Sequence, residues 1–224
     1  PKGNVNPDQG ILTIKGTLNN NGHIHNKNIL NVEGTLNNFL WSSYDNYDGL
    51  ILNDGTINNE GTIINNNEGT FINDNSGKIN NRGPFTNEGD LETGYLFYNH
   101  DILTNSGTLT IDHELNNSGT FNNDGNLINN RQLINQGTIF NEDTFTNHSR
   151  FINWEIFTNE GTINNTDTII PKFTNEGTID NHDTFNNDGT LNNEGTIYAD
   201  GTYSKGGTFH NEGTIHNKGT IHNK

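Results

Sequence analysis

The chain has 224 residues, a formal net charge of −16, no cysteine and no methionine. Its 11 Lys and Arg residues stand against 27 Asp and Glu residues, which disfavours nucleic acid and anionic membrane surfaces as partners, because both require a basic surface. The sequence contains no apolar run of about 20 residues, so it predicts no membrane-spanning helix.

A six-residue apolar repeat begins soon after Gly10. An apolar residue recurs every six positions from Leu12 and Leu18 as far as Leu36, and the repeat resumes only at Ile51. Fixed self-similarity of this kind is the signature of a repeat architecture. The interruption therefore predicts a loop, residues 39–50, inserted into the repeat.

The inserted loop is rich in aromatic residues. It contains Phe39, Trp41, Tyr44 and Tyr47, which lie outside the regular pattern. These side chains are candidates for a lateral contact with a glycan or a neighbouring filament. The alternative is that the loop folds back and covers the side of the stack.

The apolar repeat then continues to the last residues of the sequence. Two eight-residue steps lead through Phe71 to Ile79, after which every sixth residue is apolar up to Ile169. A register slip follows at 170–172, where Pro171 lacks the amide hydrogen that a central strand needs, and the beat then runs to Ile221. About 34 six-residue repeats on one beat predict a single domain over residues 1–224.

Each repeat predicts one β-strand followed by a corner. Side chains alternate between the two faces of a strand, so the apolar residue and the Asn two positions later point inward. Gly two positions earlier permits the close backbone approach of a corner. Stacked Asn amides can bond to one another at the spacing of parallel strands. The predicted structural side chains are Asn117, Asn129, Asn141, Asn153, Phe145 and Phe157.

The fold class is therefore all-β, a single parallel β-solenoid, and its coil size follows from the number of sides. Phe occupies alternate beats at Phe85, Phe97, Phe121, Phe145 and Phe157. This parity favours 12-residue, two-sided coils. An 18-residue triangular left-handed β-helix is the alternative.

Two families share this pattern. The repeat resembles the hexapeptide of left-handed β-helices, with Gly177 before Ile179 and Gly213 before Ile215. The Gly-Thr-apolar-x-Asn repeats also look like those of secreted microbial surface and adhesin-like proteins. The second resemblance implies an extracellular or cell-surface location.

Catalysis is not expected. The hexapeptide family includes acyltransferases, whose chemistry needs a His base in a cleft. His25, His210, His216 and His222 all occupy an outward position of ordinary repeats. We therefore predict that the chain is not an enzyme.

Acidic residues gather at the corner position of the repeats. On a 12-residue coil, a column of Glu176, Asp188, Asp200 and Glu212 would form. Stacked carboxylates repel one another, and Ca²⁺ would relieve that repulsion through oxygen coordination. These residues are Ca²⁺ candidates, against the alternative of a solvated corner; no other cofactor is expected.

Thr directly before the apolar residue recurs in consecutive repeats from Thr178 to Thr220. Such arrays resemble those of ice-binding proteins. A Thr-x-Thr face needs a second Thr two positions later, where the chain supplies Asp180, Asn186 and His210 instead. Ice binding is accordingly an alternative function.

The regular repeat also approaches both ends of the sequence, where an open solenoid edge exposes strand amides. The terminal coils, with Leu12, Leu18, Ile215 and Ile221, are therefore predicted to pair head to tail with other copies and give a filament. The predicted function is a structural subunit of an extracellular filament or cell-surface appendage. A passive adhesin stalk is the main alternative.

Overall fold

The structure is a computed structural model in which all secondary structure of the described residues is β-strand. The described residues are 10–20, 22–38, 50–65, 69–73, 77–165, 172–175, 178–181, 184–187, 190–193, 196–199, 202–205, 208–217 and 220–223; after residue 165, side chains are described only at 193, 196, 197 and 211–216.

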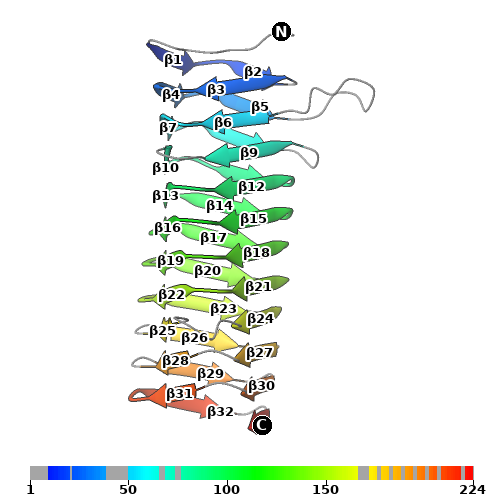
Figure 1. The fold of residues 1–224 in the computed structure, drawn as a ribbon, viewed down its shortest axis with the longest axis vertical. Coiled ribbons are helices and arrows are strands. Elements are labelled where there is room, and N and C mark those ends of the chain that lie inside the picture. Colours follow the sequence, from blue (N-terminus) through cyan, green and yellow to red (C-terminus); the bar gives the residue numbers. More distant parts are fainter. Residues whose placement is uncertain are drawn as a thin grey trace.

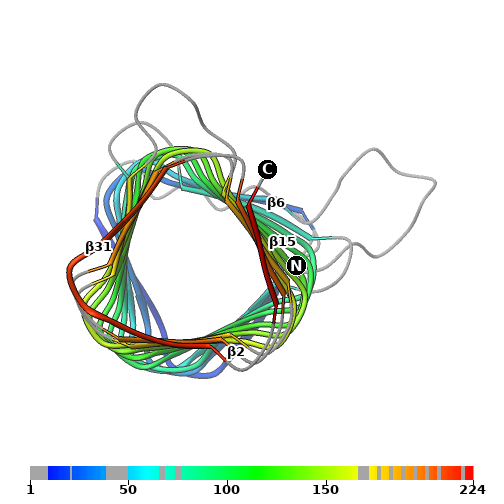
Figure 2. The same ribbon diagram turned by 90° about the horizontal axis from the view of Figure 1, so that it is seen from below.

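The strands stack into a tall column of coils (Figure 1), and three parallel sheets of eleven strands run its length. Viewed from the end, the sheets form three sides around a common interior (Figure 2). We call them sheets I, II and III. Eleven coils at about 4.8 Å per strand give a rod about 50 Å long. The predicted all-β parallel solenoid is confirmed.

Successive strands of one sheet come from successive coils. Sheet I contains β1 (Ile11–Ile14), β4 (Ile29–Val32), β7 (Thr56–Asn59), β10 (Lys78–Asn81), β13 (Leu96–Asn99), β16 (Glu114–Asn117), β19 (Gln132–Asn135), β22 (Arg150–Asn153), β25 (Lys172–Asn175), β28 (Thr190–Asn193) and β31 (Thr208–Asn211). Sheet II contains β2 (Thr17–Asn20), β5 (Thr35–Asn38), β8 (Thr62–Asn65), β11 (Phe85–Asn87), β14 (Ile102–Asn105), β17 (Thr120–Asn123), β20 (Thr138–Asn141), β23 (Ile156–Asn159), β26 (Thr178–Asn181), β29 (Thr196–Ala199) and β32 (Thr214–Asn217). Sheet III contains β3 (His23–Asn26), β6 (Leu50–Asn53), β9 (Thr70–Asn73), β12 (Asp90–Thr93), β15 (Thr108–Ile111), β18 (Asn126–Asn129), β21 (Thr144–Asn147), β24 (Thr162–Asn165), β27 (Thr184–Asn187), β30 (Thr202–Lys205) and β33 (Thr220–Asn223).

The coil size differs from the favoured prediction. A regular coil has 18 residues and three sides, so the preference for a 12-residue, two-sided coil is wrong. The Phe pattern misled because Phe alternates with aliphatic residues along sheet II, where Phe85, Phe121 and Phe157 lie two coils apart. Two coils of 18 residues span the same length of chain as three steps of 12 residues. Phe residues that recur every second coil therefore also fit the spacing expected for a two-sided ribbon.

The strands bury every second side chain, as a half-exposed strand requires. In most strands of four residues, the second and fourth residues are buried and the first and third are partly exposed. One continuous apolar core, in which Leu30, Ile79 and Ile139 are fully buried, runs through the centre of the rod. The six-residue beat therefore marks the inner face of all three sheets.

Glycine allows neighbouring corners to approach closely. A Cβ at Gly137 would collide with the backbone carbonyl oxygen of Gly119 in the preceding coil, whereas a Cβ at Gly16 would have no atom within 4 Å. Asp101 and Glu155 occupy the same corner position in other coils, so the backbone can shift to admit a side chain.

We therefore expect Gly137→Ala to lower the free energy of unfolding by about 1–3 kcal/mol, the usual cost of overpacking. Gly16→Ala is the matched control and should change stability little. Thermal and urea denaturation followed by circular dichroism measure both. Equal stability of the two variants would contradict the contact.

Two predicted irregularities fall mainly outside the described residues. Of the inserted loop at 39–50, only Leu50 is described, and it begins β6. The predicted slip at 170–172 also lies almost wholly outside, but β25 continues sheet I beyond it, with Phe173 in register with Phe151. Sheet I therefore keeps its inward positions across the slip.

Candidate functional site

Asparagine side chains stack inside the rod, next to each corner. The Asn117 Nδ2 donates to Asn135 Oδ1 at 2.8 Å, and the Asn135 Nδ2 donates to Asn153 Oδ1 at 2.7 Å. All three side chains are essentially buried. The predicted Asn ladder is confirmed, and each amide satisfies the next.

The same amides also hold the corners. Besides its ladder bond, Asn117 Nδ2 donates to the carbonyl oxygens of Gly119 at 3.1 Å and Thr138 at 3.0 Å. An Asn at this position therefore ties its own corner to the next coil. A buried carbonyl left without such a donor would cost about 1–3 kcal/mol.

The four predicted ladder residues do not form one column. Asn117 and Asn153 belong to the ladder of sheet I, Asn141 to that of sheet II and Asn129 to that of sheet III. The reason is the 18-residue coil, which places residues 12 apart on different sides. Three ladders, one per sheet, line the interior.

The ladders differ in continuity. That of sheet II runs unbroken from Asn20 to Asn159 in the described residues. In sheet I, Val32 precedes Asn59, and the buried Asn59 Oδ1 has no partner in the described part of the chain. Sheet III is interrupted at Thr93 and Ile111. Between Asn20 and Asn159, sheet II thus has the most continuous ladder, whereas Ala199 of β29 occupies the ladder position farther along the same sheet.

The predicted core residues Phe145 and Phe157 are fully buried, but on different sheets. Phe151 of sheet I completes a layer with them. The ring centroids of Phe145 and Phe151 are 5.3 Å apart, and those of Phe151 and Phe157 are 5.2 Å apart, in edge-to-face arrangements. Three inward rings fill one triangular coil, a role for Phe151 that two-sided packing could not predict.

The predicted Ca²⁺ column falls mostly outside the described residues. Glu176, Asp188 and Asp200 lie outside the described residues, and Glu212 is exposed. The four strands preceding these residues, β25, β27, β29 and β31, belong to sheets I, III, II and I. Only Glu176 and Glu212 therefore follow strands of one sheet. Among the described side chains, no group of three or more His, Asp and Glu residues could hold a metal ion.

Two of the described histidines contact side chains of a neighbouring coil. His25 Nε2 lies 2.7 Å from Asp54 Oδ2, and His100 Nδ1 lies 2.7 Å from Ser118 Oγ. His216 is exposed, while the side chains of His210 and His222 lie outside the described part. These contacts join adjacent coils at the surface.

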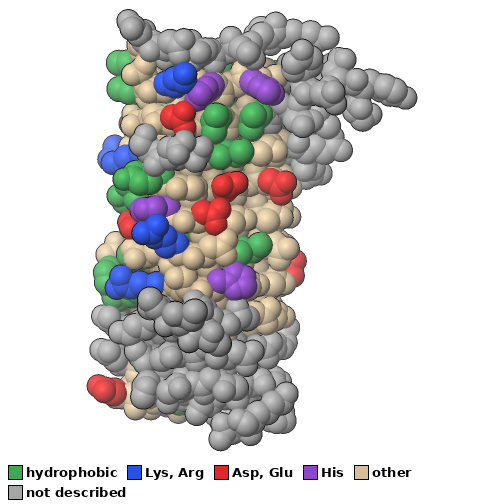
Figure 3. Space-filling view, in the orientation of Figure 1, with side chains coloured by type: hydrophobic (Ala, Val, Ile, Leu, Met, Phe, Trp, Pro, Cys, Tyr) green, Lys and Arg blue, Asp and Glu red, His purple; other side chains and the backbone are tan. Residues whose placement is uncertain are grey.

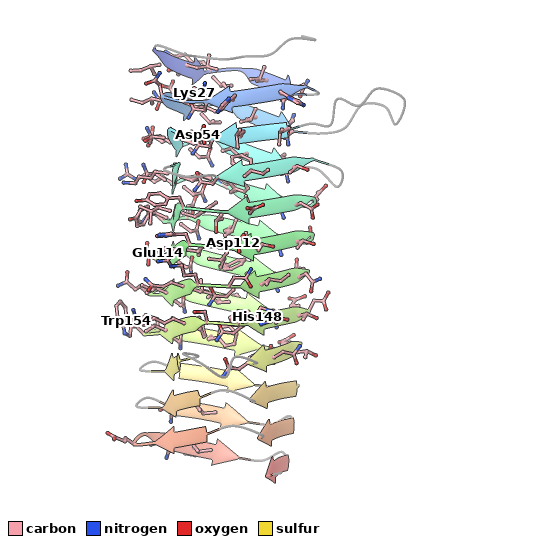
Figure 4. The ribbon with its side chains drawn as sticks, viewed as in Figure 1. Lys27, Asp54, Asp112, Glu114, His148 and Trp154 are labelled. Atoms are coloured by element: carbon pink, nitrogen blue, oxygen red, sulfur yellow. The ribbon has the colours of Figure 1, made fainter. Side chains whose placement is uncertain are left out.

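Charged and polar side chains lie on the outer faces of sheets I and III and at the corners that follow their strands. Figure 3 shows acidic, basic and His side chains on one face of the rod, and Figure 4 shows Asp54, Asp112 and His148 following one another down that side. On sheet I, Gln132 Nε2 donates to Glu114 Oε2 at 3.0 Å, and Arg150 Nη1 donates to Gln132 Oε1 at 3.2 Å. Opposite charges are thus linked through an amide across three coils.

Threonine rows are split among the three sheets. Among the described strands, Thr occupies both outward positions only in β15 and β21 of sheet III. The intervening strand β18 presents Asn126 and Ile128. The Thr-x-Thr array that favours ice binding is therefore not continuous on any described face.

The predicted end residues lie at the ends of the core. Leu12, Leu18 and Ile215 are partly buried and pack against it. Ile221 is in strand β33, in register with Tyr203, and its side chain is not among those described. These three side chains are therefore less buried than the equivalent residues of the inner coils.

Sequence reasoning placed lateral contacts on Phe39, Trp41, Tyr44 and Tyr47, which lie outside the described residues. The described surface has other exposed large apolar side chains, including Phe140, Trp154 and Ile156. Trp154 projects from the turn after β22 (Figure 4). Their common location on sheet II, or in the turn that precedes one of its strands, becomes visible in the sequence only when repeats are sorted at intervals of 18 residues.

Comparison with known families agrees with this architecture. The haemagglutinin repeat model matches residues 2–38, 44–89, 87–182 and 158–224, and so covers almost the whole chain. The chain belongs to the haemagglutinin repeat family. Haemagglutinin-repeat solenoids are structural and adhesin-like, and they are typical of secreted or cell-surface proteins.

No curated protein and no solved structure matches this haemagglutinin-repeat chain significantly. In the described part of the chain, no helix has the length and apolar character needed to cross a membrane.

Proposed function

We propose that this chain is a structural subunit of an extracellular filament or surface appendage, in which copies stack head to tail through the ends of their solenoids. The partial burial of core residues in the first and last coils carries the proposal. Leu12 and Leu18 at one end and Ile215 at the other are partly buried, whereas Leu30 and Leu36 in the second coil are fully buried.

The two ends are compatible in register. The inward apolar residue is the second residue of each strand in β1 and β2, as it is in β32. A first coil placed over a last coil would therefore continue the apolar columns and extend the parallel sheets. Stacking of this kind does not close on itself and produces a filament.

The experiment introduces a charge at each end. We expect Ile215→Glu and Leu18→Glu to weaken end-to-end association by about 100-fold or more, because an unpaired carboxylate would be buried at the junction. Thr214→Glu in the strand of Ile215 and Thr13→Glu in the first coil, on sheet I, place the same charge on outward positions and are the controls. Light scattering and electron microscopy measure polymer length.

Two outcomes would overturn the proposal. One is that the Ile215→Glu and Leu18→Glu chains polymerise as the controls do. The other is that the unmodified chain remains single rods of about 50 Å at all concentrations. The second outcome favours a passive adhesin shaft. Circular dichroism of the monomers verifies that each variant is folded.

A further inference from the structure

The outer face of sheet II carries most of the exposed apolar side chains. Five large hydrophobic residues are exposed in the described part of the chain, and four lie on this sheet or in the turn that enters it. These four are Ile102 (43% exposed), Phe140 (40%), Trp154 (38%) and Ile156 (46%).

Three of the four are close together. Strands β20 and β23 are paired with Thr138 opposite Ile156 and Phe140 opposite Thr158, so Phe140 and Ile156 are diagonal neighbours on the outer face. Such neighbours are about 7–8 Å apart. Trp154 lies in the turn immediately before β23, and Ile102 stands in the same column as Ile156, three strands away.

The same face is uncharged. From β2 to β23, no outward residue of sheet II is Asp, Glu, Lys, Arg or His, although the chain has a net charge of −16. The outward residues are Thr17, Asn19, Thr35, Asn37, Thr62, Ile64, Thr86, Ile102, Thr104, Thr120, Asn122, Thr138, Phe140, Ile156 and Thr158. Sheets I and III, by contrast, carry charged residues among these coils, including Lys78, Glu114 and Arg150 on sheet I and Asp90 and Glu92 on sheet III.

We propose that the outer face of sheet II binds the same face of a second copy, so that two rods associate side by side. Two strongly acidic rods repel each other least where neither presents a charge. The eight strands from β2 to β23 cover about 500 Å² per copy at normal strand spacings. The total of about 1,000 Å² is at the lower limit for a specific interface, so the pairing is weak and reversible.

Acidic corner residues border the face and set the salt dependence. Asp124, Glu142 and Glu160 follow the sheet II strands β17, β20 and β23. When two faces meet, these carboxylates approach their counterparts at the rim, and added salt screens that repulsion. Lateral association therefore strengthens with salt, whereas binding of a basic partner to the acidic rod would weaken.

The test introduces negative charges on the outer face of sheet II and compares their effect on lateral association with that of the same charges on sheets I and III. In Phe140→Glu/Ile156→Glu, lateral association is expected to weaken at least tenfold. The control Ile128→Glu/Ile134→Glu makes the same charge change on outward positions of sheets III and I and should associate normally. Sedimentation velocity is run at low and high salt on the Ile215→Glu chain, so that end-to-end stacking does not contribute.

Cysteine cross-linking supplies an independent readout, because the chain has no native cysteine. Under mild oxidation, Thr104→Cys in β14, next to the middle of the face, should give disulfide-linked dimers, and Thr110→Cys on sheet III should not. Equal cross-linking of both variants would overturn the proposal. So would a chain that stays monomeric while Phe140→Glu/Ile156→Glu loses binding on a glycan array, since the face would then recognise sugar.

Discussion

Replacing Phe151 with alanine is expected to lower the free energy of unfolding by about 3–5 kcal/mol, the usual cost of deleting a buried aromatic side chain. Phe151 is fully buried, and its ring lies 5.3 Å from that of Phe145 and 5.2 Å from that of Phe157. The substitution removes one of three rings in a layer to which each sheet contributes one.

The matched control is Phe140→Ala, the same substitution on the outer face of sheet II, where Phe140 is 40% exposed. Urea denaturation and native-state hydrogen exchange measure the two variants. Because a solenoid coil contacts mainly its neighbours, lost exchange protection should centre on the coils around β22. A Phe151→Ala chain as stable as Phe140→Ala would contradict the three-ring layer.

The sequence predicts the strand pattern well because it depends on local geometry. Side chains alternate along a strand, so residues such as Leu115 and Asn117 identify the inner face without any knowledge of the coil. The Asn ladder follows from the same phase, since any stack of parallel coils brings equivalent amides within bonding distance. Both features hold for two-sided and three-sided coils alike.

The number of sides depends instead on how side chains from different strands fill the interior. Phe145, Phe151 and Phe157 are consecutive beats that meet in one layer, but their spacing of six is equally regular on a two-sided coil. The predicted acidic column assumed a two-sided coil for this reason. The uncharged outer face of sheet II could not be predicted without the number of sides, because Ile102 and Ile156 share a column only on an 18-residue coil.

Replacing Asn123 with aspartate is expected to lower the free energy of unfolding by at least about 3 kcal/mol at neutral pH, because it leaves buried groups unpaired and adds a buried charge. Asn123 accepts a bond from Asn105 at 2.7 Å and donates to Asn141 Oδ1 at 2.7 Å and to the Gly125 carbonyl oxygen at 2.7 Å. A carboxylate retains the first bond but cannot donate the others, and it faces the Asn141 oxygen.

The control is Asn122→Asp, which makes the same chemical change one residue earlier, where the side chain points outward from β17. Urea denaturation at neutral and acidic pH separates the cost of the buried charge from the cost of the lost hydrogen-bond donors. Protonation removes the buried charge and supplies one donor, so the loss in Asn123→Asp should shrink as the pH falls, while Asn122→Asp stays near the unmodified chain throughout. If both variants were equally stable at neutral pH, the ladder would contribute little, and apolar packing alone would hold the coils in register.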